Sequence, residues 1–136
     1  MSLDSAAEKL RAYALTYPET FEEAPWGDRV VKVRGKIFFF CGVHGKQLYV
    51  TAKLPKSGKG VLKRPYAEPT HYGMGKHGWV TCKFASEKEV PEAEVLDWIG
   101  ESFAAVAPKR LVAGLAAWFI LHMLQVRKST LAAPAT

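Results

Sequence analysis

The fold follows from residues 29–54, RVVKVRGKIFFFCGVHGKQLYVTAKL, in which strand-like segments are joined by turns that contain glycine. Val31 and Val33 alternate with Lys32 and Arg34, as in a strand with one buried face. Turns this short reverse the chain and pair consecutive strands side by side. The segment therefore predicts short antiparallel strands linked by hairpins.

Three more strands complete the predicted sheet. Residues 37–43 are apolar on both faces, as in a central strand, and His44-Gly45 leads into a strand over residues 47–54. Residues 79–84 form another strand after a glycine-rich stretch. Between these strands, the glycine and lysine content of residues 56–64 predicts a basic loop with a short helix.

Helices are expected before the first and after the last of these strands in the sequence. Ser5 and Glu8 have the spacing of a capping box, and Pro18 ends the apolar face that follows them. Pro91 stands at the first helical position before a helix over residues 92–106. The order of elements predicts a two-layer α+β fold, in which helices pack on one face of an antiparallel sheet.

Charge is unevenly distributed along the chain. Of the 19 Lys and Arg residues, twelve lie between Arg29 and Lys83, where Glu68 is the single acid. The rest of the chain is net acidic, and the formal net charge of the whole is +6. A basic stretch of this kind predicts a polyanionic partner.

The alternation of the strands predicts a binding face. If the valines of the strands face the helices, lysines and the aromatic residues Tyr49 and Trp79 project from the opposite face. The cations could neutralise phosphates, and the rings could stack on unpaired bases. The predicted nucleic-acid-binding residues are Lys32, Arg34, Tyr49, Lys53, Lys63, Arg64, Lys76, Trp79 and Lys83.

Other functions remain open at this stage. The lysines could simply solvate an open sheet face and protect its edges. A protein-interaction or chaperone-like module is the second reading, and an enzyme or metabolite binder is the third. Trp26, Tyr72 and Trp79 are each better explained as packing or hinge residues than as ligand contacts.

No catalytic or cofactor site is predicted. The stretch from Gly73 to Val80 fits a dinucleotide-binding pattern, but that pattern must open a helix and here it leads into a strand. Turn glycines explain it better. The amides and lysines of residues 55–60 could hold an anion loosely. The four histidines lack metal-ligand spacing, and Cys41 and Cys82 are expected to be reduced, buried thiols of a cytoplasmic protein.

A series of short motifs runs along the chain: Tyr17-Pro18-Glu19-Thr20, Ala24-Pro25-Trp26-Gly27, Val31-Lys32-Val33-Arg34-Gly35-Lys36-Ile37-Phe38, Lys53-Leu54-Pro55, Ala67-Glu68-Pro69-Thr70 and Tyr72-Gly73-Met74-Gly75-Lys76-His77-Gly78-Trp79-Val80. In order and spacing, over residues 3–115, they resemble the YjbR/MmcQ family. The resemblance implies a small α+β domain similar in fold to type III secretion chaperones. It also implies DNA binding through a double-wing motif, without any catalytic residue set.

The C-terminal tail departs from that family pattern. Residues 111–126 are apolar nearly all round, which predicts a helix that must be covered on more than one side. Its length is below the roughly 20 residues that span a bilayer, so stable membrane insertion is not expected. We predict a domain over residues 1–115 and a helical extension over residues 116–136 with a disordered end. The extension could cap the sheet face, lie in a membrane interface between Lys109-Arg110 and Arg127-Lys128, or form a homodimer through Trp118, Phe119, Leu121 and Met123.

Overall fold

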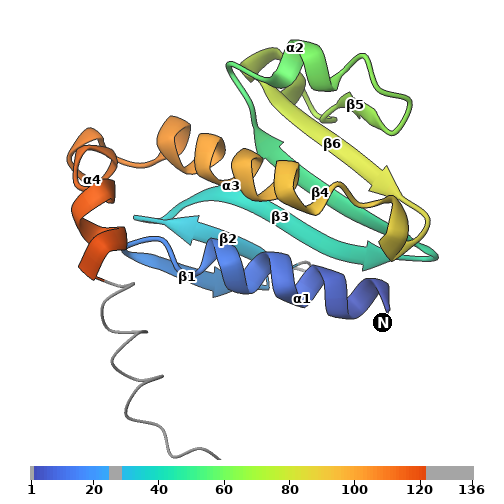
Figure 1. The fold of residues 1–136 in the computed structure, drawn as a ribbon. Coiled ribbons are helices and arrows are strands. Elements are labelled where there is room, and N and C mark those ends of the chain that lie inside the picture. The colour runs from blue at the N-terminus through green and yellow to red at the C-terminus, as the bar shows by residue number, and fades with distance from the viewer. Residues whose placement is uncertain (1, 25–28, 122–136) are drawn as a thin grey trace, which may run out of the picture.

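The computed structural model describes residues 2–24 and 29–121 and shows a six-stranded, fully antiparallel sheet in the order β1-β2-β3-β4-β6-β5 (Figure 1). The strands are β1 (Thr20–Glu23), β2 (Val30–Val33), β3 (Lys36–His44), β4 (Gln47–Lys53), β5 (Ala67–Pro69) and β6 (Trp79–Phe84). The predicted hairpins over residues 29–54 are confirmed. Two short strands, β1 and β5, were not predicted, because neither shows a run of alternating residues long enough to recognise.

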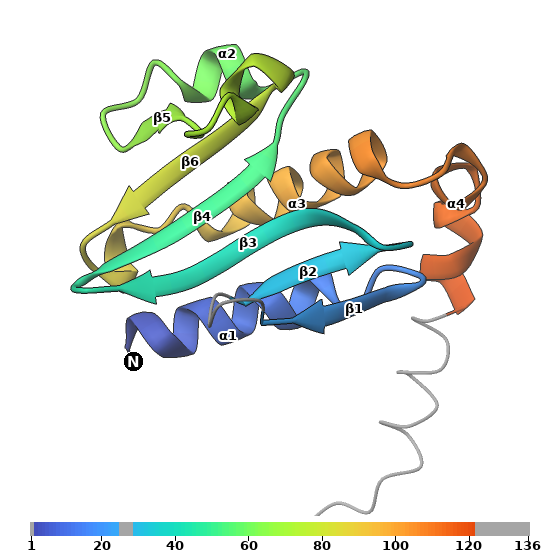
Figure 2. The same ribbon diagram turned by 180° about the vertical axis from the view of Figure 1, so that it is seen from behind.

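Two long helices cover one face of the sheet. The helices α1 (Leu3–Ala14) and α3 (Glu92–Val106) lie side by side on that face (Figure 1). Seen from behind, no helix of the described residues crosses the opposite face (Figure 2). The α+β fold class is therefore confirmed, and one sheet face is left open.

The shorter helices lie in the connections. They are α2 (Gly58–Val61), the 3₁₀ turns η2 (Met74–His77) and η3 (Glu87–Glu89), and α4 (Lys109–Ala113). The start of α1 differs from the prediction. Ser2, whose side chain accepts a hydrogen bond from the Ser5 amide, caps the helix, so Ser5 and Glu8 do not form a capping box.

A β-bulge places two successive phenylalanines in the core. Val31 of β2 pairs with Phe39, and Lys32 pairs with Ile37, so Phe38 is the extra residue. Phe38 and Phe39 are both fully buried. Because a bulge re-aims one side chain, the strand can be apolar at both positions without being covered on both faces. The prediction of a central strand is confirmed, since β3 pairs with β2 and β4, but the side of β3 that carries Phe40 faces the open surface.

The tail packs against the end of the domain away from the open sheet face (Figure 1). Gly114 interrupts the predicted continuous helix over residues 111–126, and residues 115–121 are again helical. The Trp118 indole donates a hydrogen bond to the Thr16 carbonyl at 2.9 Å. The Phe119 ring meets the Tyr17 ring edge-on, with their centroids 5.2 Å apart. In its described part, the extension therefore does not cap the sheet face.

Some of the residues named in the predictions for the tail lie outside the described part of the chain. Met123 and the predicted disordered end lie beyond the described residues. Within the described ranges, no helix is long and apolar enough to cross a membrane. The boundary at residue 115 remains a prediction.

Candidate nucleic-acid interface

The open sheet face is built mainly by β4 and β6. Antiparallel register places Tyr49 opposite Lys83 and Lys53 opposite Trp79. Residues opposite each other in an antiparallel pair share a face. Since Leu48, Val50 and Ala52 are buried towards the helices, the intervening residues of β4 point the other way. The predicted face of Tyr49, Lys53, Trp79 and Lys83 is therefore present as one surface.

Aromatic rings line this face. The Phe40 and Trp79 rings meet edge-on with centroids 5.9 Å apart. The Lys83 ammonium lies 5.3 Å from the centre of the Tyr49 ring. Phe21 of β1 pairs with Lys32 and is 41% exposed. The sequence did not single out Phe21 or Phe40: the first lies in an unpredicted strand, and the second lies in an apolar run that concealed its direction.

Threonine hydroxyls occupy the centre of the face. The Thr51 and Thr81 hydroxyl oxygens are 2.9 Å apart, and the Thr70 oxygen lies 3.0 Å from that of Thr81. Thr51 and Thr81 are buried although no helix covers them. Their hydroxyl groups satisfy each other.

Intramolecular ion pairs neutralise four of the predicted phosphate contacts. Residues far away in sequence supply most of the acids, which is why a count along the chain overstates the free positive charge. The pairs are Lys32 with Glu23 at 2.7 Å, Arg34 with Glu19 at 3.1 Å, Arg64 with Glu94 at 2.5 Å, and Lys83 with Glu68 at 2.9 Å. The hydrogen bond between Lys83 and Glu68 raises the pKa of the lysine and lowers the pKa of the carboxyl group.

Two of the predicted phosphate contacts that have no ion-pair partner in the described residues, Lys53 and Lys76, lie at one end of the sheet. Among the described residues, Lys53, Lys63 and Lys76 have no ion-pair partner. Lys53 ends β4 beside Trp79, and Lys76 lies in η2 immediately before β6. The Leu54 amide donates to the Gly78 carbonyl at 2.8 Å and holds these two segments together. Lys53, Lys76 and Trp79 therefore form the strongest part of the face, which we call the Lys53 end.

Three predicted contacts lie elsewhere. Arg34 is in the β2–β3 turn, where its backbone φ is 51°. Lys63 and Arg64 follow α2, and Arg64 is directed to Glu94 of α3 and to the Tyr66 hydroxyl. The structure does not bring these residues onto the open face.

The basic loop before α2 already holds an anion of its own chain. The Lys56 and Ser57 amides donate to one oxygen of the Glu101 carboxylate at 2.8 and 3.0 Å, and the Ser57 hydroxyl donates to the other. Burial alone would raise the pKa of Glu101, but these hydrogen bonds together hold it below its ordinary value. The loop amides that were predicted to hold an anion are therefore occupied by Glu101.

The substitution Glu101→Gln tests this attachment of the loop to α3. At neutral pH it is expected to lower the free energy of unfolding by about 1–3 kcal/mol, because a neutral amide oxygen replaces the charged acceptor and the amide NH2 group cannot accept a hydrogen bond at the other position. The carboxyl pKa is lower in the folded state, so its stabilisation is present above the unfolded pKa and disappears as pH falls through the folded value. Denaturant unfolding from pH 7 to 3 should show the two proteins converging at low pH. A constant difference would contradict this origin of the effect.

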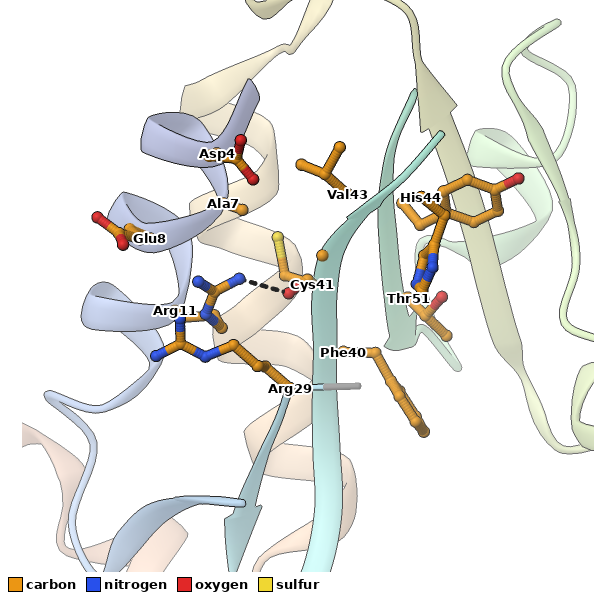
Figure 3. A pocket seen from close by; sticks show the side chains of 12 residues that line it. Asp4, Ala7, Glu8, Arg11, Arg29, Phe40, Cys41, Val43, His44 and Thr51 are labelled. Carbon is orange, nitrogen blue, oxygen red and sulfur yellow. Dashed lines mark hydrogen bonds between the residues drawn. The ribbon is translucent and has the colours of Figure 1, made fainter. Parts of the chain in front are cut away.

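A cavity of about 430 Å³ lies at the edge of β3, where this strand extends past the end of β2 (Figure 3). Residues of α1 line one side of it, and Phe40, Tyr49 and Thr51 of the open sheet face line the other. Its most buried charged group is Arg11, which donates a hydrogen bond to the Cys41 carbonyl at 2.7 Å. The Arg11 Nε atom is 3.7 Å from Glu22. Asp4, Glu8 and Arg29 also line the cavity, so its charges are mixed.

Neither cysteine has the environment of a reactive thiol. Cys41 and Cys82 are free and buried as predicted, and burial raises the pKa of each to about 12. A thiol with so high a pKa is protonated at neutral pH and is a poor nucleophile. In the described part of the chain, no group of three His, Cys, Asp or Glu residues could hold a metal ion.

The sequence of this domain matches a known protein family. A family model described as YjbR matches residues 15–105, which include the whole sheet and nearly all of α3. The chain belongs to the YjbR family. The family resemblance seen in the motifs is thereby confirmed. No match was found among curated proteins. The YjbR match ends before α4, so the tail that packs on Tyr17 lies outside it.

Proposed function

We propose that this YjbR protein binds nucleic acid through its open sheet face and is not an enzyme. The observation that carries the proposal is the Lys53 end, where a partly exposed Trp79 lies beside Lys53, a lysine with no ion-pair partner in the described residues. An exposed ring next to a free cation is the combination that binds a base and its phosphate together.

Binding is expected to be weak and to show little sequence preference. The free cations outnumber side chains placed to recognise base edges, and phosphate contacts carry no sequence information. With about four phosphates neutralised, the logarithm of the affinity should fall with the logarithm of salt concentration at a slope of roughly −3 on single strands.

The charge-reversal pair Lys53→Glu/Lys76→Glu tests the location. We expect it to reduce affinity at least about tenfold, because both free cations of the Lys53 end become acids. The matched control is Lys88→Glu/Lys109→Glu, which makes the same charge change at exposed lysines in η3 and α4. Fluorescence anisotropy at about 50 mM salt gives both affinities.

Equal losses from the two double variants would show that binding follows overall charge and not the sheet face. Thermal midpoints should stay nearly unchanged in both proteins, since exposed charges contribute little to stability. Absence of binding in the unmodified protein would reject the proposal.

A protein-interaction role is the second candidate, favoured by the tail. In the tail helix, Trp118, Ile120 and Leu121 are 40, 59 and 62% exposed, although the Trp118 indole also donates a hydrogen bond to the domain. Exposed apolar side chains grouped in this way are typical of association surfaces. A homodimer through this helix is the form that we propose, and light scattering of the full chain measures it.

A further inference from the structure

We infer that the preferred ligand of the interface is single-stranded nucleic acid, and that Tyr72 stacks on one of its bases. The inference rests on the proposed function and specifies it. It was not expected from the sequence, where Tyr72 was interpreted as a packing residue. That interpretation is wrong, because Tyr72 is 100% exposed.

Tyr72 has a left-handed backbone conformation in a turn that the Met74 amide closes by donating to the His71 carbonyl at 3.3 Å. Three non-glycine residues have positive φ in the described ranges: Glu19, Arg34 and Tyr72. Glu19 and Arg34 form an ion pair with each other. The Tyr72 hydroxyl has no hydrogen-bond partner in the described part of the chain. Its ring has one aromatic neighbour there, the His71 ring, with the two centroids 6.5 Å apart. The turn thus places an aromatic side chain in solvent at a backbone conformation that is uncommon for tyrosine, and such residues are found often at ligand-binding positions.

The loop that carries Tyr72 is fixed at its base. The Thr70 amide donates to the Trp79 carbonyl at 3.2 Å, and the Gly75 amide donates to the Thr70 carbonyl at 3.0 Å. A Cβ atom at Gly75 would lie 2.7 Å from the Pro69 side chain, so the backbones pack closely there. Hydrogen bonds thus hold the loop on both sides of Tyr72. This lowers the conformational entropy that the loop loses when a base stacks on Tyr72.

The shape and charge of the face favour a single strand over a duplex. Neighbouring strands lie about 4.8 Å apart, so a six-stranded sheet is roughly 24 Å wide and cannot enter a major groove of about 12 Å. Duplex binding would have to depend on phosphate contacts, yet Lys32 and Lys83 on the face are already paired with acids. Stacking on Tyr72, Trp79 and Tyr49 needs unpaired bases, and these are available in single strands.

The test compares an unstructured single strand of about 15 nucleotides, as DNA and as RNA, with a mixed-sequence duplex of the same length. Single strands should bind at least about tenfold more tightly than the duplex in anisotropy titrations at equal salt. Tyr72→Ala should weaken single-strand binding about tenfold, and Tyr72→Phe should retain it. Comparison of the DNA and RNA strands shows which sugar the site accepts.

A second variant separates recognition from folding. Tyr72→Gly should lose binding as Tyr72→Ala does, yet raise the thermal midpoint, because glycine adopts positive φ without strain. Leu62→Ala, at an exposed apolar residue after α2, should change neither property. Equal or tighter binding of the duplex, or unchanged affinity in Tyr72→Ala, would overturn the inference. If either result were found but the Lys53→Glu/Lys76→Glu variant lost affinity, the proposed function would stand and the inference about single strands and Tyr72 would fall. A chain that bound none of the three probes would reject both.

Discussion

Replacing Phe38 with alanine is expected to lower the free energy of unfolding by about 3–5 kcal/mol, the usual range for truncating a buried phenylalanine. Phe38 is fully buried at the bulge of β3. Its ring meets the rings of Tyr17 and Phe103, with centroids 6.4 and 5.4 Å apart. These contacts join β3, α3 and the chain after α1, so the resulting cavity would lie where the layers meet. Urea unfolding followed by circular dichroism measures the change.

Phe40→Ala is the matched control, because it removes the same side chain two residues along the same strand. Phe40 faces the open surface and is only partly buried. We expect it to be less than half as destabilising as Phe38→Ala but to weaken binding of single strands, since its ring contacts Trp79. Equal destabilisation by the two substitutions would contradict the bulge, because an unbroken alternation would put both residues on the same face.

Long alternating segments were predictable because their pattern reports a single buried face. The strand over residues 79–84 and the helix over residues 92–106 agree with β6 and α3 at both ends. Proline before the helix and glycine before the strand mark these limits physically. The open face follows from the same pattern, since polar residues alternate with core residues in β4 and β6.

Features that depend on distant partners could not be predicted. Strand β1 is four residues long and is defined by its pairing with β2, not by its own composition. The charge of the face depends on Glu23 and Glu68, which come from neighbouring strands and neutralise Lys32 and Lys83. The exposure of Tyr72 depends on how the loop leaves β5. A sequence pattern records none of these, because each arises only when separate segments meet.

Ser102 makes a buried hydrogen bond to the Phe38 carbonyl, and its loss is expected to have the second large effect. Its hydroxyl donates to the Phe38 carbonyl at 2.5 Å and accepts from the Lys53 amide at 2.9 Å. Ser102 lies on α3 and is fully buried. One side chain therefore satisfies two backbone groups, at the bulge of β3 and at the end of β4. It also fixes the backbone that carries Lys53, so core packing and the Lys53 end are physically linked.

Ser102→Ala should lower the free energy of unfolding by about 2–4 kcal/mol, because a carbonyl and an amide lose their partner together in a largely dry environment. Single-strand affinity should also fall modestly, since the end of β4 loses its attachment to α3. Ser86→Ala is the control: Ser86 caps η3 without a side-chain hydrogen bond, and its loss should cost less than about 0.5 kcal/mol. Denaturant unfolding of both variants decides the point. If Ser102→Ala were no more destabilising than Ser86→Ala, water would have to satisfy both backbone groups, and the link between α3 and the binding face would not exist.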